Sequence, residues 1–231
     1  FLIMRLHTEY HASVEEIGAL EWAELDLHDD PFMSHAFLAA TERHRAVSPR
    51  MGWHPRHVAL RDDAGLLVGA LPLYLRTHSF GDFSRDWNWP AAFEQHGVRY
   101  YPKLVSGIPY TPATGPRFLG RRGVERLPVV QQLIAAALDG VREFGCSSWQ
   151  CLFAEEDENA GLAQNELLLR RGCQFHWQNR DYRDFEDFLA SFSSEKRKKV
   201  RRERRRVAES GLRLEVLHGD EIAPELWKDI Y

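Results

Sequence analysis

The stretch RHVALR-DDAG-LLVGALPLYL, residues 56–75, decides the fold prediction. Two apolar runs, 56–61 and 66–75, flank Asp62-Asp-Ala-Gly65, and Asp and Gly supply the backbone conformations that a tight turn needs. The runs are rich in Val, Leu and Tyr and are short enough for strands. The stretch therefore predicts two adjacent antiparallel strands joined by a hairpin.

Helical patterns lie on both sides of this hairpin. Before it, Val14, Ile17, Leu20 and Trp22 have helical spacing, and residues 32–40 follow an Asp-Asp-Pro start signal. We therefore expect two helices ahead of any strand. After it, the pattern predicts in order a helix over 125–144, a strand over 148–153, a helix over 159–171 and a strand over 173–179. This alternation predicts an α/β fold with a mixed (α+β) sheet.

Residues 78–118 are rich in aromatics, Gly and Pro and predict a long irregular segment. Such segments often carry function, and polar groups among aromatic rings are a usual pocket lining. The alternative is a large loop held only by its own aromatic packing. On the first interpretation, six residues line a substrate pocket: Trp87, Trp89, Tyr101, Lys103, Tyr110 and Thr111.

Composition excludes several classes of protein. The 231 residues are 44% apolar, yet no run approaches the roughly 18 apolar residues of a membrane span, so we expect a cytoplasmic protein. Cys146, Cys151 and Cys173 are odd in number and predict reduced core residues, with no metal-ligand spacing. The sequence has no G-x-S-x-G, G-x-x-x-x-G-K-[ST] or G-x-G-x-x-G motif, which disfavours serine hydrolases, P-loop enzymes and Rossmann folds.

The charge is concentrated in one place. Residues 196–206 hold nine cations and one acid, Glu203, for a net +8; the whole chain carries −4, which leaves −12 elsewhere. Residues 184–210 predict a helical region broken at Ser193-Ser194 and ended by Gly211. On a helical wheel, Val200, Val207 and Glu203 form one stripe, opposite the cations Arg197, Lys198, Arg201, Arg204 and Arg205.

Three interpretations of this basic helix compete. It is a solvated helix whose charges meet acids elsewhere, or a site for a phosphate-bearing ligand, because Arg pairs with phosphate in bidentate fashion. Binding of long nucleic acid is less favoured, because the acidic remainder would repel it. Glu203 either neutralises its neighbours or is a buried carboxylate near a reacting amine. The predicted phosphate contacts are Arg197, Lys198, Arg201 and Arg202.

Five stretches together resemble the FemAB-like proteins of peptidoglycan biosynthesis: residues 31–38, 52–57, 100–104 with 109–115, 174–177, and 188–198. The fold of that family belongs to the GNAT acyltransferase superfamily. The resemblance implies two GNAT-like domains in tandem. Residues 1–192 are then the first domain, 193–211 a basic junction helix, and 212–231, predicted as a strand over 212–217 and a helix over 222–230, the truncated start of the second.

The resemblance also implies an activity: transfer of an acyl or aminoacyl group to an amine of a cell-wall precursor or related small substrate. Acyl-CoA or aminoacyl-tRNA is the implied co-substrate, tRNA a partner and DNA none. Arg197, Val200 and Arg201 resemble a K-x-R-x-x-[IL]-K helix of the Fem transferases, whereas the R/Q-x-x-G-x-G/A loop for acetyl-CoA is absent. We assign proton transfer to Glu203 and His176. Alternatives are a non-catalytic recognition module and an RNA-binding protein.

Overall fold

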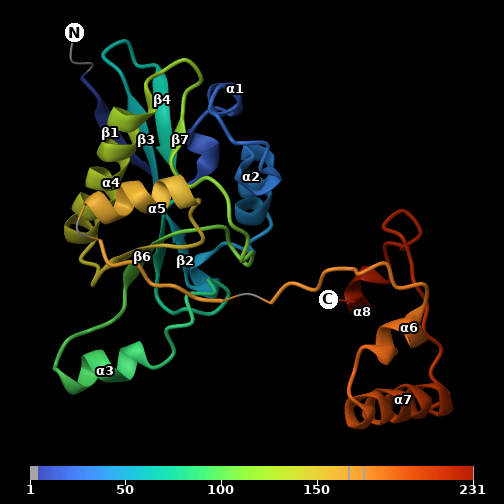
Figure 1. The fold of residues 1–231 in the computed structure, drawn as a ribbon. Coiled ribbons are helices and arrows are strands. Elements are labelled where there is room, and N and C mark those ends of the chain that lie inside the picture. The colour runs from blue at the N-terminus through green and yellow to red at the C-terminus, as the bar shows by residue number, and fades with distance from the viewer. Residues whose placement is uncertain (1–4, 166, 174, 231) are drawn as a thin grey trace. The chain divides into compact units, whose positions relative to one another are not determined.

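A computed structural model describes residues 5–165, 167–173 and 175–230 (Figure 1). The chain forms two compact units, Phe1–Arg171 and Gly172–Tyr231. Within the described residues, none of the helices combines the length and the apolar character that crossing a membrane requires. The predicted domains 1–192, 193–211 and 212–231 stay predictions, and each compact unit is described by itself below.

The first unit contains two four-stranded sheets. One has the order β1-β3-β4-β7, formed by His7–His11, His57–Arg61, Leu67–Leu71 and Leu119–Gly120. The other has the order β2-β5-β6-β8, formed by Trp53–Pro55, Tyr74–Arg76, Lys103–Ser106 and Trp149–Cys151. All pairs are antiparallel except β6 and β8, which run parallel. The predicted mixed α/β fold is confirmed.

The predicted hairpin is β3 and β4, paired with Val58 opposite Leu71. Asp62 makes its turn, because its Oδ1 accepts the N–H groups of Ala64 at 3.0 Å and Leu66 at 2.9 Å. The prediction that residues 66–75 form a single strand was wrong. It divides into β4 and β5, which lie in different sheets, at a proline, Pro72, that cannot donate a ladder hydrogen bond.

The prediction of two helices before any strand was wrong, because β1 comes first. Its sequence HTEYH is mostly polar and exposed, as an edge strand allows, so it lacks an apolar signal. The predicted helices are short: 3₁₀ turns at Val14–Glu16 and Pro31–Met33, with α1 (Ala19–Trp22) and α2 (His35–Arg43). Another 3₁₀ turn spans Pro49–Met51. Ser34 caps α2, accepting the Phe37 N–H at 3.2 Å.

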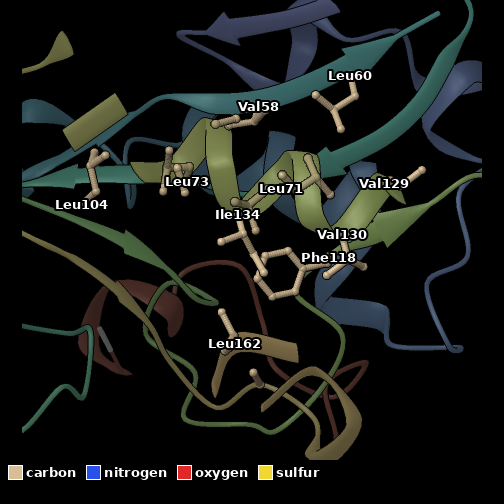
Figure 2. Close-up of a cluster of buried hydrophobic side chains, with 14 of the residues drawn as sticks. Val58, Leu60, Leu71, Leu73, Leu104, Phe118, Val129, Val130, Ile134 and Leu162 are labelled. Carbon is tan, nitrogen blue, oxygen red and sulfur yellow. The ribbon is translucent and has the colours of Figure 1, made fainter. Parts of the chain in front are cut away.

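The core lies on both faces of the first sheet. On one face, α4 (Arg126–Glu143) packs its apolar side against β3 and β4. Figure 2 shows Val58, Leu60 and Leu71 turned toward α4. On the other face, Ala59 and Ala70 meet the residues of α1 and α2. Strand β3 is therefore buried on both sides, which explains its continuous apolar run.

Two predictions between residues 78 and 171 need correction. The segment 78–118 is not wholly irregular, because it includes α3 (Trp89–Gln95), which Figure 1 shows set apart from the sheets, and strand β6. The helix expected over 159–171 is α5, Glu156–Gln164. It begins earlier because Glu155 and Glu158 form a capping box, and acidic residues are favourable in a first turn.

The second unit contains three helices among the described residues: α6 (Phe185–Ala190), α7 (Ser194–Glu209) and α8 (Trp227–Ile230). The predicted break and basic helix are confirmed, with Ser193 as the cap and Gly211 at φ +74° just beyond the end. Helix α8 is shorter than the predicted 222–230. No strand forms in the described parts of 173–179 and 212–217, where these segments have no partner strand. Residue 174 lies outside the described residues.

The cysteines only partly follow the prediction of core residues. All three are free thiols. Cys146 and Cys151 are half-buried, at the end of α4 and in β8, whereas Cys173 is exposed. Cys173 was expected inside a strand, and since no strand forms there it lacks the neighbours that would bury it.

Candidate functional site

Strands β5 and β6 place two cations side by side. Arg76 and Lys103 are directly opposite each other in the antiparallel pair, and both are fully buried. Like charges opposite each other in a sheet are destabilising, and burial adds a desolvation penalty. This arrangement therefore requires anions close by.

The loop after β5 supplies the anions, Asp82 and Asp86. Asp82 Oδ2 lies 3.3 Å from Lys103 Nζ and 3.8 Å from Arg76 Nε, and Asp86 Oδ2 lies 2.6 Å from Lys103 Nζ. Both carboxylates are buried. We call Arg76, Asp82, Asp86 and Lys103 the buried ionic cluster. It holds the loop 77–88 against the second sheet.

Asp86 accepts three hydrogen bonds on one carboxylate oxygen. Its Oδ2 accepts hydrogen bonds from Lys103, from Ser79 Oγ at 3.0 Å and from the Tyr100 hydroxyl. Burial raises the pKa of Asp86, but the hydrogen bonds from Lys103 and Tyr100 outweigh it and bring the pKa to about 2. Asp86 is therefore an anion at neutral pH and a weak proton acceptor.

Gln150 of β8 completes a ring of hydrogen bonds that runs through Lys103, Asp86 and Tyr100. Its Oε1 accepts from Lys103 Nζ at 3.1 Å, and its Nε2 donates to the Tyr100 hydroxyl at 2.7 Å. Burial, together with the bond to Asp86, raises the pKa of Tyr100. The ring joins β6, β8 and the loop, and it leaves the Tyr100 hydroxyl fully engaged.

Two successive hydrogen bonds connect this ring to Tyr101. Because the Asp86 carboxylate can only accept, Ser79 donates to it. The Tyr101 hydroxyl, 2.8 Å from Ser79 Oγ, then donates to Ser79. Tyr101 is half-buried, and its oxygen keeps its lone pairs for another donor. The carboxylate of Asp86 thus determines that Tyr101, at the edge of the site, is the donor in its hydrogen bond to Ser79.

Unpaired buried polar atoms concentrate in the same region. Among the described residues, the buried side-chain atoms without a hydrogen-bond partner all belong to β2, β5 or the loop: Trp53 Nε1, Tyr74 OH, Arg76 Nε, Asp82 Oδ2 and Asp86 Oδ1. Arg76 Nε and Asp82 Oδ2 still lie close to an opposite charge, 3.8 Å from each other. A buried polar atom with neither a hydrogen bond nor an opposite charge costs about 1–3 kcal/mol, and natural proteins retain few of them. The grouping of these atoms in one region makes it the candidate functional site.

The outer face of the loop carries exposed aromatic rings. Trp87 is 61% exposed and its ring lies 5.3 Å from that of Phe80, and Trp89 is 44% exposed. Tyr110 packs against Gly81 and donates its hydroxyl to the Ala46 carbonyl at 2.8 Å. Large exposed rings on a firmly held loop are suited to binding flat groups of a ligand.

The predicted pocket residues fall into two groups. Trp87, Trp89, Tyr101 and Tyr110 lie on or beside the loop and are accessible. Lys103 is buried in the ionic cluster, and the Thr111 hydroxyl donates to the Pro109 carbonyl at 3.1 Å. Sequence reasoning missed Arg76, Asp82, Asp86 and Gln150. The sequence held one signal for the missed acids. Lys103 directly precedes the apolar residues Leu104 and Val105, and a lysine buried with them needs an acid beside it.

The predicted phosphate contacts in α7 point in different directions. Arg197 donates to the carbonyls of Leu189 at 3.0 Å, Ala190 at 3.2 Å and Phe192 at 3.0 Å, at the end of α6. Arg201 pairs with Glu186. Lys198 and Arg202 are exposed.

The two predicted proton-transfer residues both lie in the second unit. Glu203 is 56% exposed, with Lys199 Nζ 4.0 Å from its Oε1. His176 lines a shallow hollow together with Trp177, Tyr182 and Phe188. The catalytic role of Glu203 and His176 stays a prediction.

A buried histidine offers a contrasting case. His57 Nδ1 accepts the Leu73 N–H at 3.3 Å, so Nε2 carries the proton and donates to Glu42 Oε1 at 2.8 Å. Burial raises the pKa of Glu42, but the hydrogen bond from His57 outweighs it and the net pKa is lowered. Both ring nitrogens are occupied, so this pair braces the core.

Comparison with known proteins adds the following. A FemAB-like family model, described as peptidoglycan biosynthesis/recognition, matches residues 13–231. No curated protein matches. The similar solved structures include three acetyltransferases. Aminoglycoside N-acetyltransferase AAC(6')-Iy in complex with CoA has 11% identity and a TM-score of 0.44, covering 77% of this chain and 96% of its own.

Two further similar structures have comparable scores. AAC(6')-Ih from Acinetobacter baumannii has 10% identity and a TM-score of 0.42, covering 77% of this chain and 99% of its own. Ribosomal-protein-alanine N-acetyltransferase from Brucella melitensis biovar Abortus 2308 has 13% identity and a TM-score of 0.40, covering 76% and 99%. The family match indicates a role in peptidoglycan biosynthesis or recognition.

Proposed function

Because the chain belongs to the FemAB-like family, we propose that it is a cytoplasmic N-acyltransferase or aminoacyltransferase acting on an amine of a cell-wall precursor or related small substrate. In this reaction the amine nitrogen bonds to the carbonyl carbon of an activated ester or thioester. The bond from that carbon to the oxygen or sulfur of the carrier breaks, and the amine loses a proton. The family match over residues 13–231 carries the proposal.

The loop held by the buried ionic cluster supports it. Trp87 offers a ring face on which the amide plane of a peptide precursor can stack, and Trp89 at the start of α3 is partly exposed beside it, with the Arg170 guanidinium 5.6 Å from its ring centre. The bonds of Asp86 to Lys103 and Tyr100 fix that loop before a ligand arrives, which lowers the entropic cost of binding. We propose that this loop is the acceptor side of the site.

The cluster itself acts in positioning. A carboxyl group with a pKa of about 2 is a poor base for an amine proton, so Asp86 orients the loop and does not accept the proton. We keep Glu203 and His176 as candidates for proton transfer, and acyl-CoA or aminoacyl-tRNA as candidate donors.

The test uses the full-length protein with acyl-CoAs or aminoacyl-tRNA as donors and cell-wall peptide precursors as acceptors, with the N-acylated product detected by mass spectrometry. The Trp87→Ala/Trp89→Ala variant should lower kcat/KM for the acceptor at least about tenfold, since each lost stacking contact costs roughly 1 kcal/mol or more. Trp227→Ala is the matched control, because Trp227 is also exposed but lies in α8. Acceptor binding without any transfer would instead support a recognition module.

A further inference from the structure

The hydrogen bonds of the loop after β5 end at one accessible hydroxyl group, that of Tyr101. Ser79 Oγ donates to Asp86 Oδ2 at 3.0 Å, and the Tyr101 hydroxyl donates to Ser79 Oγ at 2.8 Å. Both hydrogens point toward Asp86, because its carboxylate can only accept. We call Asp86, Ser79 and Tyr101 the hydroxyl relay. The hydroxyl hydrogen of Tyr101 is committed within the relay, whereas its oxygen can still accept.

The Tyr101 hydroxyl keeps its proton and is a good acceptor. Burial raises the pKa of Tyr101, and the charges of Asp86 and Asp82 raise it further, although the bond to Ser79 acts in the opposite direction. Hydrogen bonds in a chain polarise one another, so a hydroxyl that donates toward an anion accepts more strongly. The Tyr101 oxygen is therefore suited to receive a hydrogen bond from a ligand and not to give one.

The first unit does not supply a donor to this oxygen. Lys103 is a nearby cation, with its Nζ 6.0 Å from the centre of the Tyr101 ring. Its N–H groups go to Ser84 Oγ at 3.1 Å, Asp86 Oδ2 at 2.6 Å and Gln150 Oε1 at 3.1 Å, and an ammonium group has three. Among the described residues of the first unit, the Tyr101 hydroxyl bonds to Ser79 alone. A donor that meets Tyr101 has to come from outside this unit.

The relay also positions a pair of aromatic rings. Ser79 directly precedes Phe80, and Asp86 directly precedes Trp87. The bond between Ser79 and Asp86 therefore brings the two rings together, with their centres 5.3 Å apart. The two residues are 66% and 61% exposed. Exposed ring faces next to a relay that accepts a hydrogen bond are suited to a flat ligand group that carries an N–H.

The charges of the site select among the groups that carry an N–H. Arg76 and Lys103 balance Asp82 and Asp86, so the buried ionic cluster is neutral as a whole. An ammonium ion would leave water to meet a neutral hydroxyl rather than a carboxylate, and such desolvation is costly. A peptide amide is neutral, donates one N–H and has a flat plane for the rings. It therefore fits this surface better than a charged amine does.

We propose that Tyr101 determines the specificity of this site by accepting a hydrogen bond from a backbone amide N–H of a peptide ligand, whose amide plane lies on the rings of Phe80 and Trp87. The inference rests on the proposed function in one respect: the peptide is the cell-wall precursor that carries the acceptor amine. Tyr101 holds a peptide bond of that precursor and not the amine that is acylated.

The test exchanges the amide N–H groups of a labelled cell-wall peptide precursor for ester oxygens, one at a time. Fluorescence anisotropy measures the affinity of each peptide for the full-length protein. An ester keeps the flat shape of the amide but has no donor, and its oxygen faces the lone pairs of Tyr101. At one position the exchange should weaken binding to the wild type by about fivefold or more, as expected for the loss of a neutral hydrogen bond.

Two variants identify the residue that recognises this amide. Tyr101→Phe removes the accepting oxygen, so the ratio of amide to ester affinity at that position should fall to less than about twofold. Ser79→Ala frees the Tyr101 hydroxyl to turn and donate to the ester oxygen, so the same ratio should fall as well. Each ratio compares two ligands on one variant, and a general loss of binding or stability cancels in it.

The matched control is Tyr10→Phe, which removes a tyrosine hydroxyl that donates to the Ala136 carbonyl at 2.6 Å, between β1 and α4. Its ratio should equal that of the wild type. An unchanged ratio in Tyr101→Phe would overturn the proposal. A wild type that tolerates every exchange, or that binds none of the peptides, would overturn it too.

The proposed function is tested separately, through the N-acylated product detected by mass spectrometry. Transfer without any preference for amide over ester refutes only the role of Tyr101. The predicted preference without any transfer refutes only the transferase.

Discussion

The buried ionic cluster of the first unit and the basic helix α7 of the second treat cations in opposite ways. In the cluster, Arg76 and Lys103 each face a carboxylate, and none of the four side chains is accessible. In α7, two of the nine cations pair with acids among the described residues, Arg201 with Glu186 and Lys199 with Glu203. A buried cation requires an anion beside it, whereas an exposed helix can carry an excess of positive charge. The first arrangement positions a loop, and the second presents a surface.

The largest expected effect comes from breaking the cluster. Lys103→Met leaves Asp86 as a buried carboxylate without its cation and Asp82 with Arg76 alone, which should lower the free energy of unfolding by about 3–5 kcal/mol. Urea denaturation measures this loss. The matched control, Lys198→Met at an exposed position of α7, should change stability by no more than about 0.5 kcal/mol.

A double variant measures the coupling between Lys103 and Asp86. Lys103→Met/Asp86→Leu should lose less than the two single variants together, by about 1–3 kcal/mol, because the charges interact directly. Additive losses would mean that Lys103 and Asp86 are not coupled.

Acid should weaken the cluster next. The pKa of Asp86 falls from its ordinary 3.8 to about 2 in the folded protein. A lowered folded pKa means that the stabilisation is complete above about pH 4 and is lost as the pH falls toward 2, for a total of about 2 kcal/mol. Urea denaturation at a series of pH values should show this decline in the wild type. If Asp86→Asn declined just as steeply over this range, another carboxylate would be responsible.

The contact of α7 with the end of α6 should show a smaller effect. Arg197→Ala removes the hydrogen bonds to the carbonyls of Leu189, Ala190 and Phe192 and should destabilise the α6–α7 pair by about 1–2 kcal/mol. Faster hydrogen exchange of the α6 amides reports this change. Arg202→Ala, on the exposed side of α7, should leave the hydrogen exchange of the α6 amides unchanged. Equal effects of the two variants would mean that the hydrogen bonds of Arg197 do not stabilise α6.

The smallest effect belongs to the exposed pair of Arg201 and Glu186. A double-mutant cycle with alanine at both positions should give a coupling of about 0.2–1 kcal/mol. Salt near 1 M should reduce it, since the pair is open to solvent. A coupling above about 2 kcal/mol would show that Arg201 is buried in solution like Lys103.

Prediction from sequence succeeded where the signal was local. The hairpin of β3 and β4, helix α4 and helix α7 follow from turn residues, periodicity and caps that lie within each element. Strand β6 was missed because Lys103 reads as a surface residue until Asp82 and Asp86 are placed beside it. The expected strands over 173–179 and 212–217 have the right alternation, but a strand also needs a partner.

The candidate site was predicted in part for the same reason. Trp87, Trp89 and Tyr101 stand in a segment whose composition already indicated a pocket lining. The roles of Arg197 and Lys198 could not be separated from sequence, because the difference depends on the side of α7 that packs on α6. Asp86 was missed because its importance arises only from contacts with β6 and β8.

We propose that the loop held by the buried ionic cluster receives the acceptor. Hydrogen-exchange mass spectrometry of the full-length protein, with and without a cell-wall peptide precursor, tests this proposal. Exchange over residues 78–90 should become slower when the precursor binds, with little change over 196–206. Saturating binding that leaves residues 78–90 unchanged would contradict it.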